Sequence, residues 1–155
     1  GAGLHGGASG IVQKDLTPQP GDYHKLVHYY AHSGGGVFVT GSVEKQLDTM
    51  TVTCPVAAGC LLKTEIQVEV GNAPNGATPY EYSIGARIDT TCGLGCLDIQ
   101  GLIRTDSQPD LGWVTGHTKT FLVVAQGTHT MSASVILPYD NMEVARWQAY
   151  YSVYK

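Results

Sequence analysis

The amino-acid sequence predicts a single all-β domain, an antiparallel β-sandwich of about nine or ten strands. Three observations carry this prediction. Apolar and polar residues alternate with a period of two along most of the chain, and short segments rich in glycine, proline, asparagine and aspartate recur between those runs. No stretch combines the spacing and the caps of an amphipathic helix. A chain of 155 residues is the usual size of one domain with one core.

The first part of the chain is rich in glycine. We expect residues 1–16 to form an arm, with one short strand near 11–13, and residues 17–155 to form the sandwich. Strands are predicted at 24–32 and 36–46, separated by a turn at the serine and glycines of 33–36. The next strand, 48–54, alternates threonine with apolar residues.

The alternation is clearest in the predicted strand 60–70. Aliphatic residues such as Leu62 and Ile66 occupy one face there, and Lys63 and Glu65 the other, as a half-buried strand requires. The remaining strands are predicted at 79–90, 96–105, 112–124, 128–137 and 142–154. Many short strands with evenly spaced turns are typical of a jelly roll.

Charge excludes two classes of partner. Only 14% of the residues are charged, the formal net charge is −4, and the nine lysines and arginines are scattered singly. Nucleic acids and anionic membrane surfaces both select for clustered basic residues, so we expect neither partner. The longest apolar run, 121–125, is far shorter than the ~20 residues of a membrane-spanning helix, so no membrane insertion is expected.

The four cysteines fall into two close pairs. Cys54 and Cys60 flank a five-residue loop, and Cys92 and Cys96 flank a three-residue loop. Each pair ends one predicted strand and begins the next, and facing residues of an antiparallel hairpin lie ~4.5 Å apart at Cα, which a disulfide can span. We predict two hairpin disulfides, Cys54–Cys60 and Cys92–Cys96, that pin exposed loop tips.

Zinc is the alternative for these cysteines, but structural zinc sites usually have two to four residues between paired ligands and often include histidine. The spacings here are C-x5-C and C-x3-C, with no histidine beside either pair. Structural disulfides are typical of oxidising compartments, so we expect the protein to be secreted, extracellular or at a cell surface.

The histidines and aspartates suggest no catalytic or metal site. His24, His28 and His32 recur every fourth residue, and on a strand they would share one solvated face, ~13 Å apart, too far for one ion. A bound calcium ion is left open as an alternative by the aspartates around the second cysteine loop, namely Asp89, Asp98, Asp106 and Asp110. No nucleophile elbow or phosphate-binding loop occurs, so we predict that the protein is not an enzyme and holds no cofactor. A hydrolase would need His117 or His129 to face two aspartates in one pocket.

Two kinds of binding residue are predicted. Strand parity places several aromatic residues in the core and leaves Trp113, Tyr139 and Tyr154 for the surface. Of these, Trp113 and Tyr139 are predicted to bind a carbohydrate. The arm has four apolar residues suited to self-association as an added strand on a neighbouring chain, namely Leu4, Ile11, Val12 and Leu16.

The C-terminal quarter, 113–155, has a strand ending FLVVAQ, a GTHT turn that opens a long strand, and a final strand ending WQAYYSVYK. This pattern resembles the closing part of jelly-roll domains of the tumour-necrosis-factor and phage-tail type. The Cys54 to Cys60 segment resembles small secreted bacterial β-proteins. The resemblance implies a jelly roll that often trimerises and binds receptors or sugars.

These observations favour a secreted, non-catalytic module that self-associates into a structural or adhesive assembly, such as a fibre, an appendage or an oligomer. Its expected partner is a second copy of itself. Two alternatives remain open: a lectin-like jelly roll that binds a surface glycan or a receptor, and a hydrolase whose site the sequence does not reveal.

Overall fold

The structure is a computed structural model that describes residues 4–6, 12–14, 20–71, 80–89, 97–102 and 113–155. Regular structure in these residues is strand, apart from one 3-10 turn, η1 (Pro20–Asp22). The prediction of an all-β protein is therefore confirmed. No helix in this part of the chain is long and apolar enough to cross a membrane.

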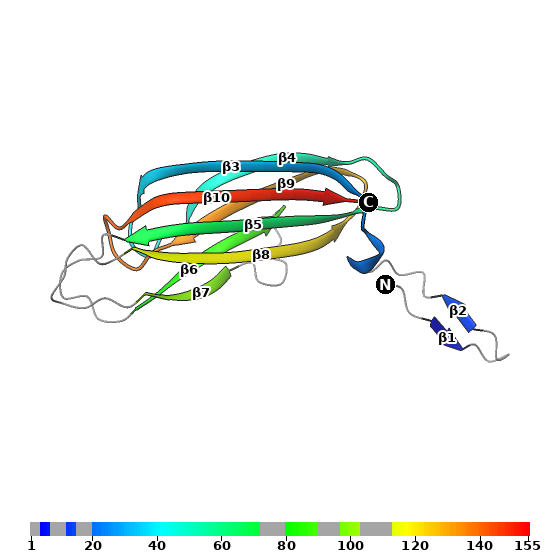
Figure 1. Ribbon diagram of the computed structural model, residues 1–155, viewed down its shortest axis with the longest axis horizontal. Helices are drawn as coiled ribbons and strands as arrows, with labels where there is room; N and C mark the ends of the chain where they lie inside the picture. Colours follow the sequence, from blue (N-terminus) through cyan, green and yellow to red (C-terminus); the bar gives the residue numbers. More distant parts are fainter. Residues whose placement is uncertain (1–3, 7–11, 15–19, 72–79, 90–96, 103–112) are drawn as a thin grey trace.

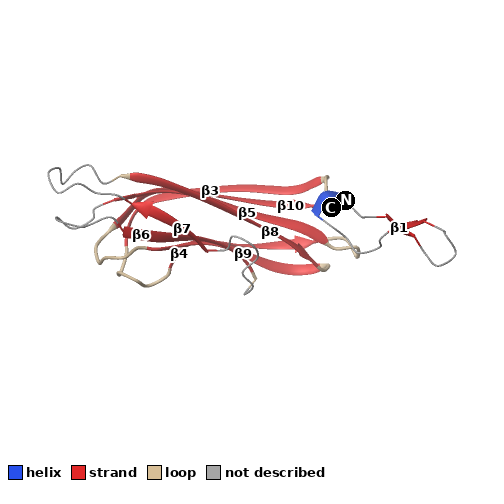
Figure 2. Ribbon diagram, turned by 90° about the horizontal axis from the view of Figure 1, so that it is seen from below, coloured by secondary structure: helices blue, strands red, loops and turns tan. Residues whose placement is uncertain are grey.

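Eight strands form two antiparallel four-stranded sheets, ordered β3-β10-β5-β8 and β4-β9-β6-β7. Figure 2 shows these sheets stacked as two layers. Two further short strands pair with each other in a separate sheet, which lies beyond one end of the sandwich in Figure 1. The strands are β1 (Leu4–Gly6), β2 (Val12–Lys14), β3 (Leu26–Phe38), β4 (Lys45–Cys54), β5 (Cys60–Gly71), β6 (Tyr80–Ile88), β7 (Leu97–Leu102), β8 (Val114–Val124), β9 (Gly127–Ile136) and β10 (Glu143–Tyr154).

The chain changes sheet at almost every connection. From β3 onward each strand is followed by a strand of the opposite sheet, except that β6 pairs directly with β7. Because of this order, the central strands β5 and β10 come from distant parts of the sequence and pair along their whole length. Residues far apart in the sequence therefore meet on each sheet face.

The core lies between the two inner faces. The alternation predicted for 60–70 is confirmed, since Leu62, Ile66, Val68 and Val70 are buried in β5 while Gln67 is exposed. Two tyrosines are almost completely enclosed, Tyr82 from β6 and Tyr151 from β10. Burial of so much aliphatic and aromatic surface is the main source of stability in a fold of this kind.

The turn predicted at 33–36 is wrong, because these residues lie within β3, a single strand where two were expected. Gly34 faces Trp147 of β10, and a Cβ at Gly34 would lie 2.7 Å from the indole ring. The glycine makes room for the indole instead of turning the chain. Residues 24–154 consequently supply eight strands to the two sheets, one fewer than the nine predicted for this segment.

Candidate functional site

The disulfide Cys54–Cys60 joins the two layers of the sandwich. The pairing predicted from the sequence is confirmed, with a Cα–Cα separation of 5.7 Å. The predicted hairpin is wrong, however, because Cys54 ends β4 in one sheet and Cys60 begins β5 in the other. Both residues are fully buried, so this bond closes the end of the core and does not pin an exposed loop tip. Cys92 and Cys96 lie outside the described residues.

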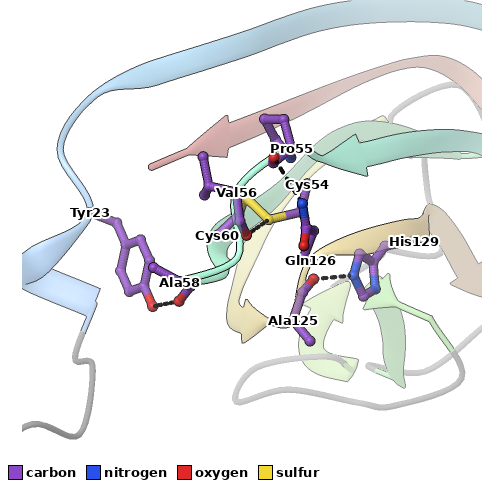
Figure 3. Close-up of a disulfide and its surroundings, with 9 residues drawn as sticks. All are labelled: Tyr23, Cys54, Pro55, Val56, Ala58, Cys60, Ala125, Gln126 and His129. Carbon is purple, nitrogen blue, oxygen red and sulfur yellow. Dashed lines mark hydrogen bonds between the residues drawn. A yellow bond between two sulfur atoms is a disulfide. The ribbon is translucent and has the colours of Figure 1, made fainter.

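Neighbouring turns hold the disulfide loop, as Figure 3 shows. The side chain of Gln126, in the β8–β9 turn, donates from Nε2 to the carbonyl of Pro55 at 3.1 Å. The hydroxyl of Tyr23 donates to the carbonyl of Ala58 at 3.4 Å. Gly59 has a φ of +89°, a conformation that other residues adopt at a cost. The two hydrogen bonds fix the loop against two other parts of the chain.

His129 connects the same corner to β6. Its Nδ1 lies 2.8 Å from a carboxylate oxygen of Asp89, and its Nε2 lies 2.8 Å from the carbonyl oxygen of Ala125. Both partners are acceptors, so both ring nitrogens must carry protons to make both hydrogen bonds. Burial disfavours the charged ring, but the hydrogen bonds and the charge of Asp89 outweigh it and raise the pKa of His129.

The second oxygen of Asp89 accepts a hydrogen bond from the backbone N–H of Thr130 at 2.9 Å. Burial acts against the ionised carboxyl, yet the hydrogen bonds from His129 and Thr130 lower the pKa of Asp89 overall. Both nitrogens of His129 are thus engaged inside the fold, which makes the ring a cross-link between β6, β9 and the β8–β9 turn.

A second polar cluster spans the two sheets at their β3 and β4 edges. Nδ1 of His32 lies 2.7 Å from Asp48, and the buried hydroxyl of Tyr151 donates to the same carboxylate oxygen at 2.8 Å. The prediction that His32 lies on a solvated face is therefore wrong, since its side chain is directed toward the opposite sheet. Burial, with Asp48 as the next cause, raises the pKa of Tyr151 strongly.

Among the histidines whose side chains the structure describes, the others do not converge on aspartates. His117 contacts Glu65 on the outer face of its sheet, with 2.8 Å between Nε2 and the carboxylate, and His28 stacks on Tyr30. Within the described part of the chain no three histidine, cysteine or acidic side chains are grouped to hold a metal ion. Asp106 and Asp110, considered for calcium, lie outside that part.

The predicted carbohydrate-binding residues lie against different glycines. Trp113 is 45% exposed, and its indole packs directly on Gly71 at the end of β5. Tyr139 is half-buried against the core in the β9–β10 turn, where its backbone packs beside Gly41. The structure places Trp113 at the surface and leaves Tyr139 mostly a packing residue.

The four apolar residues of the arm are only partly described. Leu4 belongs to β1 and Val12 to β2, where Leu4 is opposite Lys14 and Val12 is opposite Gly6. Ile11 and Leu16 lie outside the described residues. The described parts of the arm pair with each other, so its use as a strand on another chain stays a prediction.

The strand β3 presents an unusual sheet edge, which the sequence analysis did not identify. It has β10 on one side and no paired strand on the other among the described strands. Its 13 residues include no proline, lysine, arginine, aspartate or glutamate. Leu26, Tyr29 and Phe38 are 50%, 55% and 58% exposed. The sequence signal was present, but the expected turn at 33–36 divided the segment in two.

Comparisons with known proteins give little guidance. No family model matches the chain, and no curated protein matches it. The chain is similar to the crystal structure of dimeric latent PorU from Porphyromonas gingivalis, with 14% identity and a TM-score of 0.33. The likeness covers 84% of this chain and 13% of that chain, so this chain spans a small fraction of PorU. A TM-score this low carries no argument, and the resemblance to tumour-necrosis-factor-type domains stays a prediction.

Proposed function

We propose that this protein is a non-catalytic extracellular module, folded as a jelly roll, that self-associates through the free edge of β3. The unprotected edge is the observation that carries this proposal. The other elements of the proposal, namely the topology and the location, have separate support.

The strand order supports the jelly roll. Such domains have eight strands in two sheets and are built from two Greek keys, so that the chain passes repeatedly between sheets. The orders β3-β10-β5-β8 and β4-β9-β6-β7 fit this description, with the first strand of the sandwich beside the last. A buried disulfide between the sheets favours an oxidising, extracellular location.

Edge strands of stable monomers are usually protected by charged residues, proline, bulges or a covering segment, because their free N–H and C=O groups can pair with another chain. The other three described sheet edges each carry charged residues: β4 has Lys45 and Asp48, β8 has Lys119, and β7 has Asp98. In contrast, β3 has none, and three large apolar side chains are exposed along it.

The occupant that fits this edge best is β3 of a second copy. Two uncharged edges can approach without like-charge repulsion, and antiparallel pairing about a two-fold axis would join two four-stranded sheets into one. In that arrangement Tyr29 and Phe38 would be covered by the partner. The arm of residues 1–16 is the other segment of this chain that could reach a neighbouring edge.

Sedimentation velocity over a wide concentration range tests the proposal. We expect the full chain to form dimers or larger species, and the double variant Tyr29→Lys, Phe38→Lys to remain monomeric because it places repelling charges along the edge. Phe121→Lys is the matched control: Phe121 is 41% exposed on β8, an edge of the same sheet. This control should associate like the wild type.

A wild-type protein that stays monomeric at high concentration would refute self-association. Equal loss of association in Phe121→Lys would show that added charge, and not the β3 edge, is responsible. Deletion of residues 1–19 distinguishes association through β3 from association through the arm. Association through β3 alone should survive the deletion.

A further inference from the structure

The outer face of the β3-β10-β5-β8 sheet contains a groove of about 470 Å³. This lies within the range of roughly 300–1,000 Å³ that is usual for small-ligand sites. The groove runs across all four strands. Ser33, Gln148 and Gln67 are opposite one another in neighbouring strands, and Arg146, Glu69 and Thr115 form the next row.

Two glycines lie beside the groove and add no side chain to this part of the face. Gly35 occupies the β3 position opposite Arg146, and a Cβ there would collide with the backbone carbonyl of Ala145. Gly71 likewise contributes no side chain to the end of β5, where the indole of Trp113 packs on it. The register of β10 also shifts relative to β5 between Val144 and Arg146. At both glycines the close approach of a neighbouring group, the Ala145 carbonyl or the Trp113 indole, leaves no room for a side chain beside the groove.

The polar groups of the groove are available for a ligand. Arg146, Glu69 and Gln67 make no hydrogen bond or ion pair with other described residues. Gln148 uses its carbonyl oxygen to accept from the hydroxyl of Tyr150 at 2.8 Å, which leaves its amide donors free. The groove therefore offers planar donors and acceptors in a fixed arrangement across a rigid sheet.

Trp113 adds an aromatic surface beside these polar groups. It precedes β8 and is two residues from Thr115, which lines the groove. Because Gly71 is two residues from Glu69 along β5, its contact with Trp113 places the indole in the row next to the one that contains Glu69 and Thr115. An exposed, immobilised tryptophan beside amide, guanidinium and carboxylate groups provides both an apolar face and hydrogen bonds.

We propose that this groove binds a neutral carbohydrate, with hydroxyl groups bound by Arg146, Glu69 and Gln67 and a sugar ring stacked on Trp113. Vicinal hydroxyls donate and accept at once, which suits paired charged and amide groups. A polyanion fits less well because Glu69 lies beside Arg146 and the net charge of the chain is −4. An apolar ligand would leave the polar lining without partners. The proposal does not depend on self-association through β3.

Binding is tested with the full chain on an array that contains neutral gluco-, manno-, galacto- and xylo-oligosaccharides together with sulfated and sialylated glycans, followed by calorimetry with the best ligand. We expect Glu69→Gln to weaken binding at least about tenfold, because the charged hydrogen-bond acceptor is lost. Trp113→Ala should weaken binding by at least about the same factor, because the stacking surface is lost. Glu69→Gln keeps the side-chain shape, so it remains informative if Trp113→Ala folds poorly. Phe121→Ala, an exposed aromatic on the same face outside the groove, should bind like the wild type.

Three results would overturn the proposal. The first is no binding by the wild type to any oligosaccharide on the array. The second is an equal loss of affinity in Phe121→Ala. The third is a clear preference for sulfated or sialylated glycans, which would assign the groove to anionic ligands. Self-association is measured separately, so its failure leaves these results interpretable.

Discussion

Removal of the hydroxyl group should change the free energy of unfolding in opposite directions at two buried tyrosines, Tyr151 and Tyr82. The hydroxyl of Tyr151 donates to Asp48 at 2.8 Å, whereas the hydroxyl of Tyr82 is buried without a hydrogen-bond partner among the described residues. Both rings lie in the core, so replacement by phenylalanine leaves the packing of each ring intact. The comparison therefore isolates the hydroxyl groups.

For Tyr151→Phe we expect a loss of about 1.5–3 kcal/mol in the free energy of unfolding, because Asp48 is partly buried and loses one of its donors. For Tyr82→Phe we expect no loss, and a gain of up to about 1 kcal/mol, since an unsatisfied buried hydroxyl is removed. For a domain of this size the two variants should differ in Tm by roughly 3–16 °C.

Urea unfolding followed by circular dichroism measures both values under one set of conditions. His32→Gln serves as an additional variant, because it tests the other donor to Asp48. Equal destabilisation by Tyr151→Phe and Tyr82→Phe would refute the reasoning. It would mean that a hydroxyl bonded to Asp48 stabilises the fold no more than a buried hydroxyl without a partner.

Three further predictions concern the disulfide corner and the turns. Replacing Cys54 and Cys60 by alanine should cost about 2 kcal/mol, the value expected for a cross-link with a sequence separation of 6, and an unchanged urea midpoint would contradict this. The contribution of His129 to the free energy of unfolding should be complete below its ordinary pKa of 6.5 and should decrease as the pH rises through its raised pKa. The free energy of unfolding of the wild type should therefore fall over that pH range, and that of His129→Gln should depend less on pH. Gly59→Ala should destabilise more than Gly36→Ala, because both glycines have positive φ but only at Gly59 would a Cβ collide with a neighbouring backbone carbonyl; equal thermal shifts would contradict this.

Much of the fold follows from local sequence patterns. The alternation around Ile66 predicts β5 within one residue of its observed bounds, because a strand with one buried face has a period of two. Cys54–Cys60 was predictable from spacing alone, since a loop this short keeps the two residues within reach. These features depend on residues that are close in the sequence.

The errors arise where distant residues decide the conformation. Glycines 34–36 have the composition of a turn, and only the indole of Trp147, more than 100 positions later, explains why Gly34 lies in a strand. The pairing of His32 with Asp48 and Tyr151 likewise requires the two sheets to be stacked. Local periodicity cannot indicate which strands are neighbours.

The candidate binding surfaces could not be predicted either, because each is formed by residues that are distant in the sequence. The groove combines residues from β3, β10, β5 and β8, which span most of the chain, and nothing in the spacing of Glu69 and Arg146 predicts that they are adjacent. Trp113 was identifiable as a surface residue by strand parity, but its neighbours were not. The position of β3 at the edge of the described sheet became visible only once the order of the strands was known.

Hydrogen–deuterium exchange of the full chain at low and high concentration tests the proposed association most directly. If β3 pairs with a second copy, the exchange of amides in residues 26–38 should slow as the concentration rises, because their edge N–H groups become hydrogen-bonded. Residues 114–124 of β8, at the opposite edge of the same sheet, should exchange at the same rate throughout. Concentration-independent exchange along β3 would contradict the account.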